Sequence, residues 1–268
     1  MNRYEQTFIE LKKKREIAFI PFAIAQDPSA KLSETIFKTY IDSGADILEI
    51  GFPFSDPVAD GPINQRAAIR SIDAGFNFRS FFTLMKKIRS YGNSPIGILM
   101  YANSAFFLGY EEFCSRAEDA GIDSLLVADM PPEESCGLST AMTKHNLQSV
   151  YIISELTPMT RMKYICNNVT GFVYVVSRLG TTGVQTDMST SVNNTLSALA
   201  KVTDKPLCVG FGISTPEHVK NMVKAGANGA IVGSALVKII EDNVGNSSAM
   251  LSKLSKSVTA YKKSTRIS

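Results

Sequence analysis

Short apolar segments alternate with longer amphipathic stretches along the whole chain. Their apolar residues run on rather than alternating with polar ones, which is typical of parallel strands covered on both faces. The stretches between them have the periodicity of helices. Eight such units predict an α/β fold, a single (β/α)8 TIM barrel. The pattern predicts strands at residues 18–24, 46–51, 96–101, 124–128, 149–153, 172–177, 207–211 and 229–233.

Two helices flank this pattern. Residues 2–15 are predicted to form an additional N-terminal helix that covers the bottom of the barrel, and residues 247–263 the last helix. Similar segments containing Gly44, Gly121 and Gly226 each precede a strand, and each places the glycine where a helix ends in a left-handed residue. No linker rich in Pro, Gly or Ser divides the chain, so we expect residues 1–268 to form one domain.

Composition narrows the class of protein. The chain is 44% hydrophobic and 20% charged, as in ordinary globular proteins, and its net charge of +3 is too small and scattered to predict a nucleic-acid partner. The four cysteines are far apart and form no C-x-x-C pair, which argues against a metal site or a redox motif. The N-terminus lacks a signal peptide and no apolar run could cross a bilayer, so we expect a cytoplasmic protein without membrane contact.

Catalytic groups in such barrels sit at the C-terminal ends of strands and in the loops that follow. Glu49 lies near the end of an otherwise apolar strand. If its side chain points inward, desolvation raises its pKa and makes it a plausible acid and base near neutral pH. The alternative is a structural ion pair inside the barrel.

The loop after this strand, residues 53–62, carries two acids among its prolines. Its composition suggests a fixed scaffold that presents two carboxylates. Asp60 is a candidate functional group, but it could also cap a helix, since Pro62 suits the first turn of a following helix. Asp56 before Pro57 could merely start a turn.

Glycines follow three late strands, at 180–183, 210–212 and 233, the last before a short helix. Glycine lets backbone N–H groups approach an anion, and a helix N-terminus adds a favourable dipole. Each loop alone could be only a turn. Because the loops after the sixth, seventh and eighth strands converge in a barrel, together they predict a phosphate site.

Apolar residues at upper strand positions could line a pocket for a flat aromatic group, or they could simply be core. His145 and His218 fall in predicted outer helices, so acid and base work falls to carboxylates. No nucleophile motif is present. The pocket candidates are Phe22, Leu99, Leu126, Ile152, Tyr174 and Phe211.

The segment 48–62, LEIGFPFSDPVADGP, closely resembles the signature of tryptophan synthase α subunits. Further matching segments are 19–22, 99–103, 126–131, 177–183 and 210–214, so the resemblance covers essentially the whole chain. It implies retro-aldol cleavage of indole-3-glycerol phosphate to indole and glyceraldehyde 3-phosphate in tryptophan biosynthesis. Glu49 would be the general acid and base, and Asp60 would interact with the indole N–H.

The same resemblance implies the substrate contacts. The backbone at Gly183, Gly212, Gly233 and Ser234 would bind the phosphate. Thr182 would lie in a lid and hydrogen-bond Asp60 on closure. The indole would contact Phe22, Leu99, Tyr174 and Phe211. Thr181, Gln26 and Glu155 depart from the family pattern, which affects the lid and mouth loops more than the chemistry.

The resemblance also implies a partner. The family's α subunit needs no cofactor and caps a β subunit, which carries pyridoxal phosphate and receives indole through a tunnel in an α2β2 complex. Partner contacts are expected at 53–58, 103–107 and 131–134.

Two other functions compete with the lyase. One is a catalytically silent subunit that only activates its partner. The other is a different phosphate-binding barrel enzyme, such as indole-3-glycerol phosphate synthase or a sugar-phosphate isomerase. Such enzymes would lack the 53–62 loop and often use a strand lysine, which the sequence does not offer.

Overall fold

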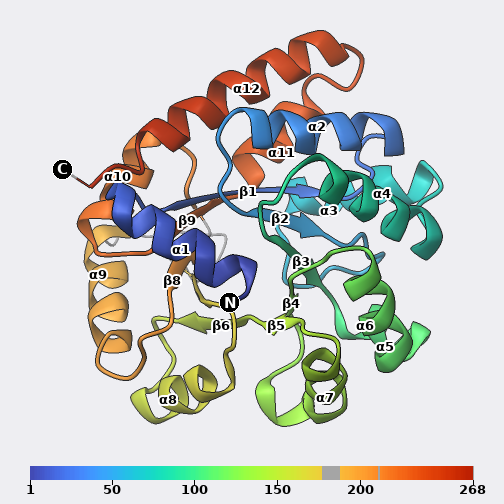
Figure 1. Cartoon of the computed structure of the whole chain (residues 1–268). Coiled ribbons are helices and arrows are strands. Elements are labelled where there is room, and N and C mark those ends of the chain that lie inside the picture. The colour runs from blue at the N-terminus through green and yellow to red at the C-terminus, as the bar shows by residue number, and fades with distance from the viewer. Residues whose placement is uncertain (177–187, 211, 268) are drawn as a thin grey trace.

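A computed structural model describes residues 1–176, 188–210 and 212–267. Within these residues, nine parallel strands form one sheet that curves into a barrel surrounded by helices (Figure 1). The strand order is β5-β4-β3-β2-β1-β9-β8-β7-β6, so the two outermost strands are consecutive in sequence. The predicted (β/α)8 architecture is confirmed.

The elements follow the predicted alternation, and the last helix has its predicted bounds. The strands are β1 (Ala18–Ile24), β2 (Leu48–Gly51), β3 (Ile96–Met100), β4 (Ser124–Val127), β5 (Gln148–Ser149), β6 (Tyr151–Ser154), β7 (Val173–Val176), β8 (Leu207–Gly210) and β9 (Gly229–Val232). The helices are α1 (Arg3–Lys14), α2 (Ala30–Asp42), α3 (Pro62–Asp73), α4 (Phe78–Tyr91), α5 (Ala102–Leu108), α6 (Tyr110–Asp119), the 3-10 helix η1 (Pro132–Glu134), α7 (Cys136–Lys144), α8 (Met159–Asn168), α9 (Met188–Leu199), α10 (Pro216–Lys224), α11 (Ser234–Glu241) and α12 (Ser247–Lys263). No helix in the described part of the chain is long and apolar enough to span a membrane.

The fifth predicted strand is divided in the structure. Its first part, β5, pairs with β4, and its second part, β6, pairs with β7. Between them, the Val150 N–H donates to the Leu125 carbonyl at 3.1 Å. One segment thus joins the two edges of the sheet and closes the barrel, and the prediction of one continuous strand at 149–153 was wrong because the segment changes partner.

Both faces of the sheet are buried, as the continuous apolar runs predict. Residues pointing outward pack under the helices, whereas inward-pointing residues such as Ile20, Leu126 and Tyr174 form a separate cluster inside the barrel. This alternation places Glu49 among the inward-pointing residues, next to Phe22 and Gly97 in the strand register. The barrel interior therefore surrounds a carboxylate with apolar groups.

The joints between helices and strands have the predicted glycine geometry. Gly44, Gly121 and Gly226 have φ values of 102°, 76° and 81°, which L-residues with a side chain rarely adopt.

Gln26 adopts φ 63° without being glycine, and its backbone N–H donates to Ser33 Oγ at 2.9 Å. Its side-chain amide donates to Ser80 Oγ at 2.7 Å. Gln26 is one of the positions at which this sequence departs from the family pattern. These hydrogen bonds offset the strain of its left-handed backbone.

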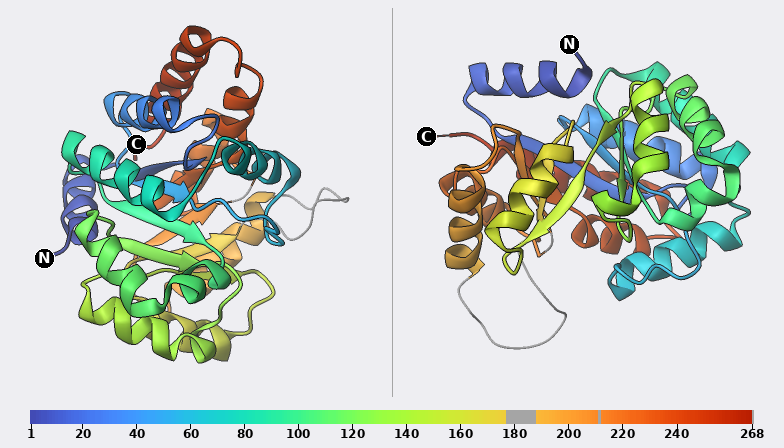
Figure 2. Two further views of the ribbon diagram at one scale, coloured as in Figure 1. Left: turned by 90° about the vertical axis from the view of Figure 1, so that its right-hand side faces the viewer. Right: turned by 90° about the horizontal axis from the view of Figure 1, so that it is seen from below.

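Helix α1 lies across the N-terminal end of the barrel, as predicted (Figure 2). Its Tyr4 is only 2% exposed, and the Tyr4 hydroxyl hydrogen-bonds Ser124 Oγ at 2.7 Å. A Cβ atom at Gly97 would lie 2.8 Å from that hydroxyl, so the absence of a side chain at this position makes room for Tyr4. The helix thereby seals the end of the barrel opposite the strand C-termini.

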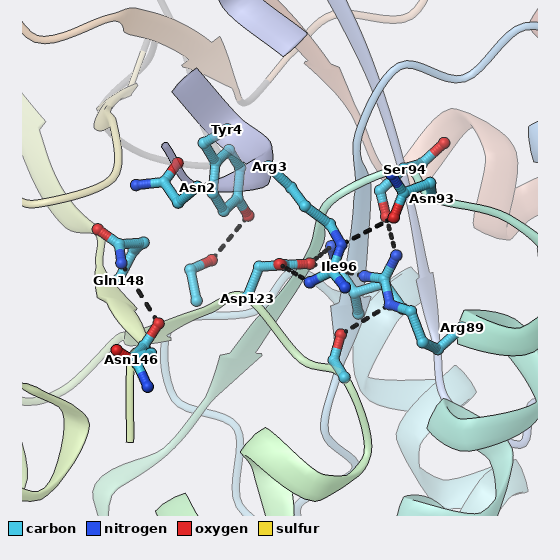
Figure 3. Close-up of polar contacts among 12 residues, drawn as sticks. Asn2, Arg3, Tyr4, Arg89, Asn93, Ser94, Ile96, Asp123, Asn146 and Gln148 are labelled. Carbon is cyan, nitrogen blue, oxygen red and sulfur yellow. Dashed lines mark hydrogen bonds and ion pairs between the residues drawn. The ribbon is translucent and has the colours of Figure 1, made fainter. Parts of the chain in front are cut away.

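Asp123 joins α1 to the barrel through a cluster of charges (Figure 3). Arg3 Nη1 donates to Asp123 Oδ1 at 2.8 Å, and Arg89 Nη2 donates to Oδ2 at 2.7 Å. The Ile96 N–H, at the start of β3, also donates to Oδ2 at 2.8 Å. A single buried carboxylate thus satisfies groups from α1, α4 and β3.

We expect Asp123→Asn to lower the free energy of unfolding by about 3 kcal/mol, because it leaves two arginines without their buried counter-ion. Urea denaturation followed by circular dichroism measures the change. The matched control is Glu112→Gln, which removes an exposed pair with Arg116 within α6 and should cost less than about 0.5 kcal/mol. Equal losses in the two variants would contradict the role given to Asp123.

Candidate active site

A cavity of about 530 Å³ opens at the C-terminal ends of the strands. Its walls come from strands β1, β2, β3, β7 and β9, from the loop after β2, and from the loops after β8 and β9. The lining residues are Phe22, Glu49, Val58, Ala59, Asp60, Gly61, Pro62, Ile63, Asn64, Leu99, Tyr174, Gly212, Ile213, Ile231, Gly233 and Ser234. The structure therefore brings together eight of the predicted site residues, namely Phe22, Glu49, Asp60, Leu99, Tyr174, Gly212, Gly233 and Ser234.

Glu49 projects from β2 into this cavity and is 5% exposed. Burial, followed by the nearby negative charge of Asp60, raises the pKa of Glu49 to about 8. Among the described residues, no cationic group forms an ion pair with it, so the alternative of a structural ion pair finds no support there. A carboxyl group with this pKa is largely protonated at neutral pH and can both give and take a proton.

Asp60 lies in the loop between β2 and α3, on the wall of the same cavity. The Tyr101 hydroxyl donates to Asp60 Oδ2 at 2.7 Å, and Asn64 Nδ2 donates to Oδ1 at 3.3 Å. Burial raises the pKa of Asp60, and these two hydrogen bonds oppose the rise. The alternative role of Asp60 as a helix cap is wrong, since Gly61 is the N-cap of α3 and Pro62 occupies its first turn.

Tyr101 anchors the loop that carries Asp60. Its hydroxyl accepts a hydrogen bond from the Ala59 N–H at 3.1 Å while donating to Asp60. Its ring stacks on Phe54 with 5.3 Å between ring centroids. The residue itself is 2% exposed. Sequence reasoning did not single out Tyr101 or Asn64, although the position of Tyr101 at the end of a strand and that of Asn64 one helical turn after Asp60 were available signals.

Another part of the cavity wall has the character of an anion site. Gly233 is the N-cap of α11 and provides no side-chain cap, so the first turn of this helix faces the cavity uncapped. Gly212 has φ 78° and lies on the loop after β8. Backbone N–H groups at a helix N-terminus favour a negative charge, which suits a phosphate at Gly212, Gly233 and Ser234.

Other parts of the cavity wall are apolar. Phe22 and Leu99 pack together, and Tyr174 is 4% exposed in the barrel interior. A Cβ atom at Gly210 would lie 2.2 Å from the Tyr174 hydroxyl, so glycine is needed beside this ring. Ile63 and Ile231 also line the cavity and were missed, because an isoleucine there looks like ordinary core in the sequence.

Other residues named in the sequence analysis lie outside the described part of the chain or outside the cavity wall. Thr182, Gly183 and Phe211 lie outside the described residues, so their roles stay predictions. Leu126 and Ile152 pack in the barrel interior and not in the cavity wall. His145, at the end of α7, pairs with Glu111 and Glu118, whereas His218 in α10 contacts the loop at Gly212.

The described residues contain no group of His, Cys, Asp and Glu side chains that could hold a metal ion. Glu155, the extra acid at the mouth, is exposed in the loop after β6.

Comparisons with known proteins identify the family of the chain. Residues 8–266 match the family model of the tryptophan synthase alpha chain. The chain is 42% identical to the tryptophan synthase alpha chain of Citrobacter koseri over 99% of its own length and all of that protein. It is 43% identical to the alpha chain of Vibrio parahaemolyticus with the same coverage.

Solved structures agree as well. Tryptophan synthase subunit alpha from Legionella pneumophila superposes with a TM-score of 0.90 at 30% identity, over 98% of each chain. A chain from the tryptophan synthase α2β2 complex of Pyrococcus furiosus superposes with a TM-score of 0.84 at 34% identity, over 92% of this chain and 98% of that one. By sequence and fold, the chain belongs to the tryptophan synthase alpha chain family.

Proposed function

We propose that this chain, a lyase-type enzyme of tryptophan biosynthesis by its family, cleaves indole-3-glycerol phosphate with Glu49 and Asp60 as its catalytic residues. The observation that carries the proposal is one cavity lined by two carboxylates and by an uncapped helix N-terminus. An indole ring fits the apolar middle and a phosphate fits the helix end.

The first step is protonation of the indole ring at C3. Glu49 is neutral at pH 7 because burial raises its pKa to about 8, so it can donate this proton. The bond formed is C3–H, and positive charge develops on the ring nitrogen. Ionised Asp60, held by the Tyr101 hydroxyl, offsets that charge and accepts a hydrogen bond from the N–H group.

The second step breaks the carbon–carbon bond. Glu49, now a carboxylate, removes the proton of the glycerol hydroxyl next to C3. The C–O bond becomes the aldehyde carbonyl, and the electron pair of the broken bond returns to the ring and neutralises its nitrogen. Glu49 ends protonated as it began, and the proton that it first gave stays on indole C3.

The backbone around Gly212, Gly233 and Ser234 holds the phosphate and so fixes the glycerol chain beside Glu49. This binding keeps the substrate in a reactive orientation, which lowers the entropic part of the barrier. Thr182, Gly183 and Phe211 keep the roles expected from the family resemblance.

A β subunit that carries pyridoxal phosphate is the proposed partner. The relative from Pyrococcus furiosus belongs to an α2β2 complex. Around the cavity mouth of this chain, Val58, Phe106 and Phe107 are 82%, 69% and 78% exposed, which is unusual for large apolar side chains. Val58 lies in the loop 53–58, whereas Phe106 and Phe107 lie in helix α5, so the segment 103–107 is helical. These two segments together with 131–134 form the proposed contact surface.

The decisive experiment measures indole release from indole-3-glycerol phosphate by wild type and Glu49→Gln, each with and without a β subunit. We expect wild-type release to rise with the partner and Glu49→Gln to lose at least about 10³-fold, since one group performs both proton transfers. Glu155→Gln removes an exposed carboxylate at the mouth and serves as the control with near-normal activity. No release by wild type, even with the partner, would instead make the chain a silent regulatory subunit.

Glu49 should also make the protein less stable as the pH rises. In the unfolded chain it ionises near its ordinary pKa of about 4.5, whereas the folded protein holds it protonated up to about 8. Stability attributable to the neutral form is therefore complete below pH 4.5, falls between pH 4.5 and 8, and is lost above pH 8.

Glu49→Gln removes this titration, so we expect the variant to gain about 3 kcal/mol over wild type between pH 5 and pH 8. Urea denaturation at both pH values measures the gap. Stability curves that stay parallel across this range would show that Glu49 ionises normally in the folded protein.

Tyr101→Phe should impair catalysis through Asp60. Without the hydroxyl donor, the pKa of Asp60 rises further, so the acidic limb of the kcat/KM profile should move to higher pH. The loss of a hydrogen bond to a charged group should also lower the plateau by about tenfold. Tyr164→Phe, on the exposed face of α8, is the control, and identical pH profiles for the two variants would contradict this role.

A further inference from the structure

A charge network connects helix α3 with the loop after β1 and with helix α11. Arg70 of α3 donates to both carboxylate oxygens of Asp27, from Nε and from Nη2, each at 2.8 Å. Its third nitrogen, Nη1, donates to Glu241 Oε1 at 3.1 Å. The side chain of Asp27 is fully buried, and that of Arg70 is 22% exposed. One guanidinium therefore bridges two carboxylates that lie far apart in the sequence.

Each of these residues lies in or just after an element that forms part of the cavity wall. Asp27 follows β1, which carries Phe22. Arg70 lies in α3, which begins directly after Asp60 and Gly61. Glu241 ends α11, the helix whose N-terminus is at the proposed phosphate site. Helices α3 and α11 pack against each other and against β1, and the network ties these elements together.

Hydrogen bonds and charge together hold the network in place. Burial raises the pKa of Asp27, and the hydrogen bonds from Arg70 oppose this rise. The pKa of Glu241 is lowered to about 2, first by its hydrogen bond with Arg66. Ser71 Oγ, next to Arg70, donates to the buried carbonyl of Ala25 at 2.6 Å. Helix α3 is thus held to the loop after β1 by two adjacent residues.

We propose that the substrate site has the carboxylates at one end and the phosphate at the other, and that Arg70 is a positioning residue, which sets the distance between these two ends. The inference rests on the proposed function for the identity of the substrate. Asp60 precedes α3 and Ser234 begins α11, so a relative shift of these two rigid helices changes the separation of the two ends. A ligand that spans the cavity senses that separation, whereas a ligand that occupies one end does not.

The test compares a spanning ligand with its two halves. Indole-3-propanol phosphate spans the cavity, while indole and glycerol 3-phosphate occupy one end each. Dissociation constants for the three probes are measured by calorimetry or competition for each variant. For Arg70→Met, we expect the halves to bind within about twofold of wild type and the spanning ligand to bind about 10- to 100-fold more weakly. In the same variant, kcat/KM should fall by a similar factor.

Arg70→Lys is the second, milder variant, because lysine keeps the charge but cannot donate from a planar fork to both carboxylates. It should fold and show a smaller loss of the same kind. The matched control is Arg89→Met, which removes a similarly buried arginine–aspartate pair at the opposite end of the barrel. That control should lower thermal stability without changing the ratio of spanning to half-ligand affinity.

Three outcomes would overturn the inference. The halves and the spanning ligand could weaken together in Arg70→Met and Arg70→Lys, which would indicate local distortion of one end. The ratio could stay at the wild-type value in both variants. Arg89→Met could change the ratio as much, which would reflect general destabilisation. Failure of the proposed function is distinguishable, because wild type itself would then neither bind the spanning ligand nor release indole.

Discussion

Burial of the Glu49 carboxyl group inside a closed apolar barrel is the constraint on which the site depends. A carboxylate in such surroundings has lost its water and finds no cation among the described residues, so its charged form is disfavoured. The fold creates this environment through strands that are covered on both faces and through α1, which closes the far end. The resulting pKa of about 8 suits a group that must give a proton before it takes one.

Asp60 shows how the same cavity gives a second carboxyl group a different role. It is less deeply buried, and the Tyr101 hydroxyl and Asn64 amide both donate to it. These donors favour the charged form, whereas Glu49 has none among the described residues. In the proposed mechanism, the two acids therefore divide the work of proton transfer and charge stabilisation because their surroundings differ, although their chemistry is alike.

The sequence predicts much of this architecture because barrels follow a simple periodicity. The strand boundaries fall within about two residues of the predicted ones, and Gly44, Gly121 and Gly226 have the expected left-handed conformation. The break at Val150 was not predictable, since a change of strand partner leaves no trace in a short apolar run. Glu49, Gly212 and Gly233 line one cavity because they lie at or just after strand ends, and their catalytic and binding roles stay predictions.

Contacts between distant segments were less accessible. The bond from Tyr101 to Asp60 and the bridge from Arg70 to Asp27 and Glu241 depend on how loops and helices meet, which periodicity does not specify. Ile231 and Ile63 line the cavity while resembling core residues, because a site for an aromatic ring is made of the same side chains as a core.

Contacts that stabilise the barrel lie at one end of its axis, and the proposed active site lies at the other. At the N-terminal end, Asp123 and Tyr4 satisfy their partners in buried contacts, and these stabilise the fold without touching the cavity. At the C-terminal end, Glu49 has no such partner among the described residues, and its burial costs stability at neutral pH. A closed sheet tolerates this cost because its strands are hydrogen-bonded on both sides. The rigid scaffold can therefore hold one carboxyl group in a destabilised state, and that state is the source of its reactivity.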